Sequence, residues 1–366
     1  MCTKVTKVAI LGGGNGGITA AADLAEKGFS TALYELPRFF NNLSVIKEKG
    51  EILLEDDEGK RPVKIDLVTD DINAAIEGAQ IVMLTVPGFA IEAFAEVLAP
   101  VVQEDQIIFM NGAAAMGCVR FANKAKEMGI DKQFKLCEDN SLTYGTRAFA
   151  SEARAECSLR VHKLFIAGYP HTLTEEVLPV LSQIYDGLVP AKNIWHTTLE
   201  NGNPVVHPGP CLMNSGRIDY SKGEFWLYKE GITEHTIRIL HGVEHEQMAI
   251  GKVFGFEIED AVQSRARRGY LANETDDLQM QFNTSKVFTQ IKGPTSCTAR
   301  YFTEDISTGL VLWSDLGKVA GVPTPTIDAI ITLGGTLLDR DFREEGLTLN
   351  KLGLKGSTVE ELSAEV

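Results

Sequence analysis

The stretch Gly12-Gly13-Gly14-Asn15-Gly16-Gly17 decides how the first half of this chain folds. An apolar, β-branched run at residues 5–11 precedes it and predicts a buried strand. An alanine- and leucine-rich run follows at residues 18–27 and predicts a helix that stops at Gly28. Gly12, Gly14 and Gly17 therefore match G-x-G-x-x-G between a strand and a helix. In that setting the glycines permit a tight turn, the approach of a pyrophosphate, and close packing of the helix on the strand.

Glu35 strengthens this interpretation, because it follows directly on a second predicted strand at residues 30–34. An acid at that position accepts hydrogen bonds from an adenosine ribose. The N-terminus of the helix offers unpaired N–H groups to the phosphates, and Asn15 and Gly16 of the loop before it are expected to contact the cofactor. The sequence therefore predicts a dinucleotide site with NAD as the cofactor. A glycine-rich structural turn is the alternative.

Strand and helix patterns alternate through the first half of the chain and predict a doubly wound, mostly parallel sheet of the Rossmann type over residues 1–190. Further strands are expected at residues 81–86, 106–110, 134–138 and 159–167, a hairpin at 51–65, and helices at 43–49, 71–78, 89–98 and 172–184. The last helix should open with a capping box, Thr172-x-x-Glu175, and Asp71 should cap the helix that follows it.

The ends of two strands supply further candidates for cofactor contact. Ligands of such sheets lie beyond the carboxyl ends of the strands. Val86, Pro87 and Asn111 occupy such ends and should border the nicotinamide half of the cofactor. The alternative for all three is ordinary turn chemistry.

The second half, residues 191–366, changes to helical periodicity, with helices expected at residues 232–254, 303–319 and 326–341. It predicts a C-terminal, mainly α-helical domain that binds substrate. Phe225, Trp226 and Tyr228 are expected to serve packing rather than substrate contact.

The composition excludes several classes of partner. The chain has 366 residues and a net charge of −15, with 35 basic and 50 acidic residues, which argues against nucleic acid or an anionic membrane surface. No apolar run approaches the ~20 residues that cross a bilayer. The first strand begins too early to leave room for a signal peptide. Scattered cysteines without a C-x-x-C pair indicate reduced thiols in a cytoplasmic protein. The expected assembly is a homodimer. The cysteines are Cys2, Cys118, Cys137, Cys157, Cys211 and Cys297.

Several separate motifs of the second half resemble the octopine dehydrogenase family of opine dehydrogenases, and above all its bacterial members. They are Asn203-Pro204-x-x-His207-Pro208 with Leu212-Met213-Asn214, Glu230-Gly231-Ile232-Thr233, Arg300-Tyr301-Phe302-x-Glu304-Asp305 and Pro323-Thr324-Pro325. Together with the glycine motif, the resemblance covers nearly the whole chain.

The resemblance implies an enzyme that joins an α-keto acid, often pyruvate, to the amine of an amino acid and reduces the imine with a nicotinamide cofactor. It implies that His207 and Asp305 form the catalytic pair and that Arg300 holds the keto acid. Asn203, from the same motif as His207, is expected to contact substrate.

These residue types suit such chemistry without the resemblance, although each has a simpler alternative. Imidazole titrates near neutral pH, and a neighbouring aspartate can fix its tautomer. A guanidinium can bind a carboxylate through two parallel hydrogen bonds. Alternatively, His207 is a structural hydrogen bonder, Asp305 is an acid in the first turn of a helix that begins near residue 303, and Arg300 pairs with Glu304.

Three rival functions follow from the same sequence. A 2-keto acid or ketopantoate-type reductase would need no amine, and an NAD-binding sensor would show no turnover. His241-Gly242-Val243-Glu244-His245 also matches the H-x-x-E-H pattern of a zinc hydrolase. Its charged surroundings favour a solvated helix face, so no metal is expected.

Overall fold

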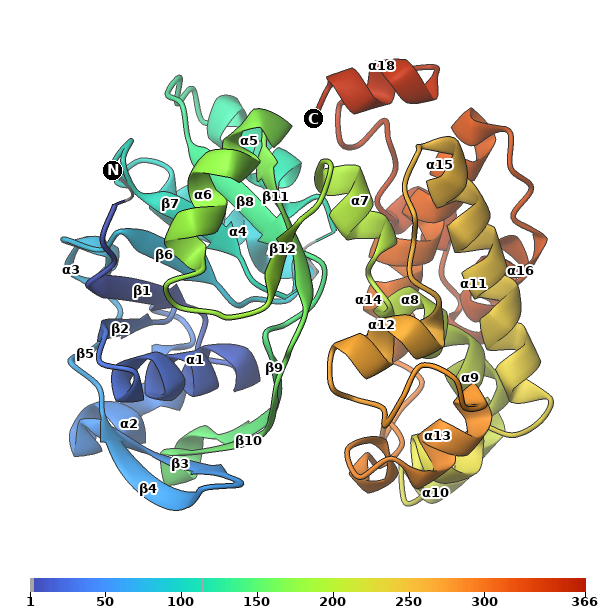
Figure 1. The fold of residues 1–366 in the computed structure, drawn as a ribbon, viewed down its shortest axis with the longest axis horizontal. Helices are drawn as coiled ribbons and strands as arrows, with labels where there is room; N and C mark the ends of the chain where they lie inside the picture. The colour runs from blue at the N-terminus through green and yellow to red at the C-terminus, as the bar shows by residue number, and fades with distance from the viewer. Residues whose placement is uncertain (1–2, 113–114) are drawn as a thin grey trace. The chain divides into compact units, whose positions relative to one another are not determined.

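The computed structural model describes residues 3–112 and 115–366, and contacts divide the chain into two compact units, Met1–Thr197 and Thr198–Val366 (Figure 1). Unit 1 and unit 2 below refer to these ranges. The sequence places the boundary slightly earlier, after residue 190.

In the described part of unit 1 the main sheet has eight strands in the order β12-β11-β8-β7-β6-β1-β2-β5. Every neighbouring pair is parallel except β8 with β11. The strands are β1 Lys7–Leu11, β2 Ser30–Tyr34, β5 Leu67–Thr69, β6 Ile81–Leu84, β7 Ile107–Met110, β8 Lys135–Asp139, β11 Leu164–Tyr169 and β12 Leu188–Pro190. The predicted mostly parallel sheet is confirmed.

Helices cover both faces of this sheet because successive side chains of each strand point to opposite sides. Val8 and Ile10 of β1 belong to the core shared with α1 and α6, whereas Ala9 and Leu11 belong to the core shared with α3, α4 and α5. The helices of unit 1 are α1 Asn15–Glu26, α2 Ser44–Lys49, α3 Ile72–Ile76, α4 Ile91–Leu98, α5 Gly117–Glu127 and α6 Thr174–Leu181, and α7 Ile194–Leu199 crosses the boundary. Short 3-10 turns lie at Phe40–Leu43, Gly88–Ala90, Ala150–Glu152 and His171–Leu173.

A second, four-stranded sheet of unit 1 has the order β4-β3-β10-β9. Its strands are β3 Glu51–Asp56, β4 Gly59–Lys64, β9 Tyr144–Phe149 and β10 Arg154–Arg160. The predicted hairpin is confirmed as the β3–β4 pair. The sequence pattern did not indicate β9, which pairs with β10 and packs beside α1.

The single strand predicted at residues 159–167 is wrong. The chain leaves the second sheet at Arg160 and enters the main sheet at Leu164. Between them the N–H of Val161 donates to the carbonyl of Thr143 at 2.9 Å, which turns the chain from one sheet to the other. An apolar run cannot show which sheet each half of it will join.

One of the two predicted helix caps is confirmed. The carboxylate of Asp71 accepts from the N–H groups of Asn73 and Ala74 at the start of α3. The capping box at Thr172 and Glu175 is wrong, because α6 begins only at Thr174 and has no side-chain cap. The hydroxyl of Thr174 instead accepts from the N–H of Gly168 at 2.9 Å.

Unit 2 is mainly helical, as predicted. Its helices are α8 Asn203–Val206, α9 Pro208–Met213, α10 Ser215–Ser221, α11 Thr236–Val253, α12 Ala261–Arg267, α13 Leu278–Thr284, α14 Arg300–Glu304, α15 Val311–Ala320, α16 Pro325–Leu338, α17 Phe342–Glu345 and α18 Val359–Ala364. A 3-10 turn lies at Phe288–Gln290, and π-helical turns lie at Leu227–Gly231 and Asp305–Leu310. The helix predicted at residues 303–319 is therefore broken by a π turn.

Among the described residues, no helix is long and apolar enough to cross a membrane. Every cysteine that the structure describes is a buried free thiol, at positions 118, 137, 157, 211 and 297. Cys2 lies outside the described residues.

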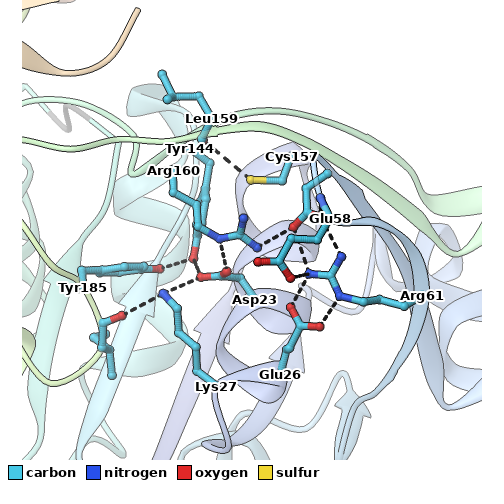
Figure 2. Close-up of polar contacts among 12 residues, drawn as sticks. Asp23, Glu26, Lys27, Glu58, Arg61, Tyr144, Cys157, Leu159, Arg160 and Tyr185 are labelled. Carbon is cyan, nitrogen blue, oxygen red and sulfur yellow. Dashed lines mark hydrogen bonds and ion pairs between the residues drawn. The ribbon is translucent and has the colours of Figure 1, made fainter.

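A network of charged side chains joins α1 to the second sheet (Figure 2). The buried carboxylate of Asp23 on α1 accepts from Arg160 at 2.6 Å and from the hydroxyl of Tyr144 at 2.8 Å, and pairs with Lys27 at 2.9 Å. Arg160 also reaches Asp56 at 2.8 Å. Burial alone would raise the pKa of Asp23, but the charge of Lys27 and the hydrogen bonds hold that pKa below its ordinary value.

We expect this network to make the protein sensitive to acid. A carboxylate whose pKa is lower in the folded than in the unfolded chain stabilises the fold above the unfolded value of about 3.9, and that contribution is lost as pH falls through the folded value. Asp23→Asn should therefore lower the free energy of unfolding by about 1–3 kcal/mol at pH 7. The difference from wild type should shrink below about pH 4. Thermal unfolding measured from pH 3 to pH 7 tests this.

Asp57→Asn, at an exposed position in the turn between β3 and β4, is the matched control and should track wild type throughout. A difference between wild type and Asp23→Asn that persists unchanged at pH 3 would contradict the electrostatic explanation.

Candidate active site

Two of the glycines in the first loop are required by the close approach of α1 to β1. A Cβ on Gly17 would lie 1.8 Å from the carbonyl oxygen of Gly12. A Cβ on Gly12, whose φ is +112°, would lie 2.8 Å from the carbonyl oxygen of Thr85 at the end of β6. Only glycines at these positions let the helix start directly at the end of the strand. The sequence did not single out Thr85.

Gly14, unlike these two glycines, is not required by close packing. It is exposed, and a Cβ there would meet nothing within 4 Å. No side chain caps the N-terminus of α1, so its first N–H groups are available to a ligand. Asn15 has its side-chain oxygen occupied by the N–H of Ala148 at 2.9 Å, which leaves its backbone N–H for phosphate. This open cradle fits a pyrophosphate.

Glu35 lies half-buried at the end of β2. One carboxylate oxygen accepts from the N–H of Gly13 at 2.8 Å and the other from the N–H of Leu36 at 2.7 Å. The acid is thereby held beside the glycine loop, where a ribose next to the pyrophosphate would require it.

The other predicted cofactor residues differ in accessibility. Pro87 is exposed and Val86 half-buried just beyond β6. Asn111 is buried, and its amide nitrogen donates to the hydroxyl of Thr143 at 2.9 Å while its oxygen accepts from the N–H of Thr143 at 3.1 Å. The Asn111 side chain therefore holds the loop after β8, and the residue can border a ligand only through that loop or its backbone.

In unit 2 the structure brings His207 and Asp305 together. The imidazole Nδ1 lies 2.8 Å from a carboxylate oxygen of Asp305, and both side chains are almost fully buried. His207 sits between α8 and α9, where Pro208 begins the second helix. Asp305 begins the π turn that follows α14, and such turns are frequent at functional sites.

The alternative that placed Asp305 in the first turn of a helix is wrong. The helix starts at Arg300, three residues earlier than residue 303, so Asp305 follows its last turn. A carboxylate there gains nothing from the positive helix end. Its side-chain hydrogen bond is to His207.

Arg300 pairs with Glu304 and remains accessible to solvent. Its guanidinium lies 3.6 Å from the carboxylate of Glu304, one turn along α14. Its side chain is nevertheless 63% exposed, so the guanidinium can still receive a carboxylate from solution.

Asn203 begins α8, one turn before His207, whose N–H donates to its carbonyl at 3.0 Å. Its side chain is half-buried and makes no hydrogen bond to any residue that the structure describes. It is therefore free to contact a ligand of His207.

Tyr301 is a neighbour of His207 whose role the sequence did not indicate. Its ring stacks on the imidazole with a centroid distance of 4.0 Å and an interplanar angle of 17°. The available signal was an aromatic residue four positions before Asp305 on a helix, which places both side chains on one face.

Side chains from α11 and α12 hold the segment that leads into α8. Gln247 donates to the carbonyl of Leu199, and Arg268 donates to the carbonyl of Glu200 at 2.9 Å. Arg265 donates to the carbonyl of Gly202 at 3.0 Å. These contacts fix the backbone just before His207. Burial and the charge of Arg268 lower the pKa of Arg265 to about 10, so it remains protonated near neutral pH.

The H-x-x-E-H motif joins two helices. His241 Nδ1 lies 2.7 Å from one carboxylate oxygen of Glu244, and the other oxygen accepts from the N–H of Ala261 at the start of α12. The hydrogen bond to Glu244 raises the pKa of His241. Within residues 3–112 and 115–366, no three His, Cys, Asp or Glu side chains are arranged to hold a metal ion.

Tyr228 packs in an aromatic cluster, with its ring centroid 5.4 Å from Phe282 and 4.6 Å from Phe288. Phe225 is likewise buried, and Trp226 pairs with Lys292. The aromatic run serves packing in this structure.

Family models match both halves of the chain. Residues 190–338 match the model for the NAD/NADP octopine/nopaline dehydrogenase α-helical domain, and residues 7–124 match the model for the NAD-dependent glycerol-3-phosphate dehydrogenase N-terminus.

Whole-chain comparisons agree with these models. The chain is 33% identical to an opine dehydrogenase of Arthrobacter sp. (strain 1C), with 96% of each protein covered. It also resembles a structure of octopine dehydrogenase with NADH and L-arginine, at a TM-score of 0.73 and 20% identity over 99% of this chain and 98% of that one. A structure of yersinopine dehydrogenase with NADP+ bound matches at a TM-score of 0.70 and 16% identity over 99% and 97%. At these identities the two structures support the fold.

Alanine at Gly14 and at Gly17 should separate cofactor binding from folding. Gly17→Ala should lower both the melting temperature and the affinity for NADH, because its Cβ would displace α1. Gly14→Ala fits the backbone, so the melting temperature should stay unchanged, while NADH binding should weaken by about 10-fold, equivalent to about 1.4 kcal/mol. NADH fluorescence titration and thermal unfolding measure the two effects. Unchanged NADH affinity in Gly14→Ala would show that the pyrophosphate does not bind at this loop.

Proposed function

The chain belongs to the octopine dehydrogenase family, and on that premise we propose that His207, Asp305 and Arg300 carry out its reaction. It is an NAD-dependent oxidoreductase acting on CH–NH bonds, an opine dehydrogenase. The reaction is the reductive condensation of an α-keto acid with the amine of an amino acid. Pyruvate is the keto acid that we propose.

The observation that carries the residue assignment is the buried pair of His207 and Asp305. A hydrogen bond from Nδ1–H to the carboxylate leaves Nε2 as the ring atom that exchanges a proton with substrate. The carboxylate stabilises the imidazolium when Nε2 is protonated. One side chain can therefore act as acid in synthesis and as base in the reverse direction.

The other residues bind and orient. Arg300 holds the carboxylate of the keto acid through its exposed guanidinium, and Asn203 contacts the substrate from the start of α8. A nicotinamide cofactor, when bound, would supply the hydride that reduces the imine carbon. His207 supplies or removes the proton of the substrate nitrogen.

We assign cofactor binding to residues 1–190 and substrate binding to residues 191–366. Gly12 and Gly17 shape the turn at the cofactor site, whereas Gly14 and the N–H groups of Asn15 and Gly16 receive the phosphates. Glu35 accepts from the ribose hydroxyls and disfavours a 2′-phosphate. Val86, Pro87 and Asn111 would border the nicotinamide at the ends of the strands.

The active form that we propose is a homodimer. Helix α16 exposes an uncharged face that includes Leu333 and Leu337, which are 51% and 40% exposed. Two copies of a chain with a net charge of −15 repel one another, and an uncharged face reduces that repulsion. The other exposed residues of this face are Ala329, Thr332 and Thr336.

We place the enzyme in the cytoplasm. Its described cysteines are buried free thiols, which suits a reducing compartment.

The assay that tests the reaction follows NADH oxidation with pyruvate and each of the twenty common amino acids. We expect turnover only when an amine is present. His207→Ala should lower kcat by about 10²–10⁴-fold, the usual effect of losing a general acid or base. Asp305→Asn should also lower kcat while leaving NADH affinity unchanged, and the two effects should not add. Turnover of pyruvate alone would indicate a 2-keto acid reductase, and NADH binding without turnover would indicate a sensor.

The dependence of the rates on pH shows in which direction His207 transfers the proton in synthesis and in oxidation. Synthesis should slow as His207 loses its proton with rising pH, whereas opine oxidation should accelerate over the same range. The oxidative direction is the cleaner measurement, because the charge state of the free amine also affects synthesis. An unchanged ionisation in the oxidative profile of His207→Ala would assign the proton transfer to another residue.

Arg300→Lys retains the positive charge but loses the planar fork. We expect the KM for the keto acid to rise about 10- to 100-fold, equivalent to about 1.4–2.8 kcal/mol, with NADH affinity unchanged. Steady-state kinetics and NADH titration on the same preparation measure both. A parallel loss of NADH affinity would place Arg300 in the cofactor site or in the fold.

A further inference from the structure

The imidazole of His207 is held by two side chains from one stretch of helix. Asp305 contacts Nδ1 in the plane of the ring at 2.8 Å, and Tyr301 covers a face of the ring at 4.0 Å. Tyr301 and Asp305 are four residues apart, so α14 and the turn after it present both toward His207. The in-plane bond fixes the tautomer, and the stacked ring restricts the tilt of the imidazole.

Two ionisable groups near the pair are uncharged at neutral pH. Burial raises the pKa of the Cys211 thiol on α9 and of the Tyr228 phenol on the π turn at Leu227–Gly231. Both are therefore neutral near pH 7. From α14, Arg300 lies 5.9 Å from the ring centroid of Tyr301 and pairs with Glu304.

The ring of Tyr301 lies near two groups that carry positive charge during the reaction. The imidazole of His207 stacks on it, and the guanidinium carbon of Arg300 lies 5.9 Å from its centroid. The electron-rich face of an aromatic ring attracts a cation, so the ring favours the protonated form of the histidine stacked on it.

We propose that Tyr301 is a positioning residue, whose ring orients His207 and stabilises its protonated form. This proposal rests on the acid–base role of His207 given above. Both effects come from the ring of Tyr301, so a phenylalanine, which keeps that ring, should preserve them.

The test compares Tyr301→Phe with Tyr301→Leu in the full-length protein. The titration midpoint of His207 is measured by NMR of the imidazole protons, and the signal is identified by its loss in His207→Gln. Tyr301→Phe should keep the wild-type midpoint and kcat. Tyr301→Leu should lower the midpoint by about 0.5–1 pH unit. It should lower kcat for opine oxidation by about 10- to 100-fold through misplacement of the base, with the KM for NAD unchanged.

A second variant keeps the test decisive if leucine prevents folding. Pentafluorophenylalanine at position 301 retains the shape of the ring but withdraws electron density from its face, so the midpoint should fall as in Tyr301→Leu. An unchanged midpoint in both variants would overturn the proposal, and so would a shift in Tyr301→Phe equal to that in Tyr301→Leu.

The NMR measurement does not depend on catalysis, which separates the two claims. If His207→Gln leaves the oxidative pH profile unchanged, the acid–base assignment fails whatever the NMR result. If His207→Gln abolishes the ionisation in the oxidative profile while Tyr301→Leu leaves its midpoint unchanged, only the role of Tyr301 fails.

Discussion

The hydrogen bond between His207 and Asp305 joins the two distant segments of unit 2 that form the candidate active site. The two residues are 98 positions apart, and each occupies a break in regular helix. A buried pair of this kind is weak support for stability, because desolvation offsets much of its attraction. We therefore propose that the α8–α9 junction and the π turn after α14 orient the imidazole of His207 rather than stabilise the fold.

Much of the fold followed from local patterns in the sequence. The glycine loop, the strand that ends at Glu35 and the cap at Asp71 each depend on neighbours within one turn or one strand. The second sheet could not be predicted in the same way. Strand β9 is mostly half-exposed and is paired by contacts from elsewhere in the chain, and the split at residues 161–163 reflects a change of sheet that no local pattern records.

The same distinction between local and long-range information applies to the residues of the candidate site. The glycines of the cofactor loop could be chosen from spacing alone, whereas His207 and Asp305 required the resemblance to a family, since their contact joins distant segments. Spacing also misplaced the start of the helix that carries Arg300, and with it the surroundings of Asp305. Tyr301 was visible as a residue of that motif, but its stacking on His207 depends on where α9 lies.

The segment at residues 199–202 has a practical consequence for building chimaeras. Its carbonyls are held by Gln247, Arg268 and Arg265, so this strip of backbone belongs with α11 and α12 although it adjoins unit 1 in sequence. An exchange of substrate domains between relatives should place its crossover before Leu199. A crossover after Gly202 would pair one parent's backbone with the other's guanidinium groups and disturb His207 without altering any residue that we propose to contact substrate.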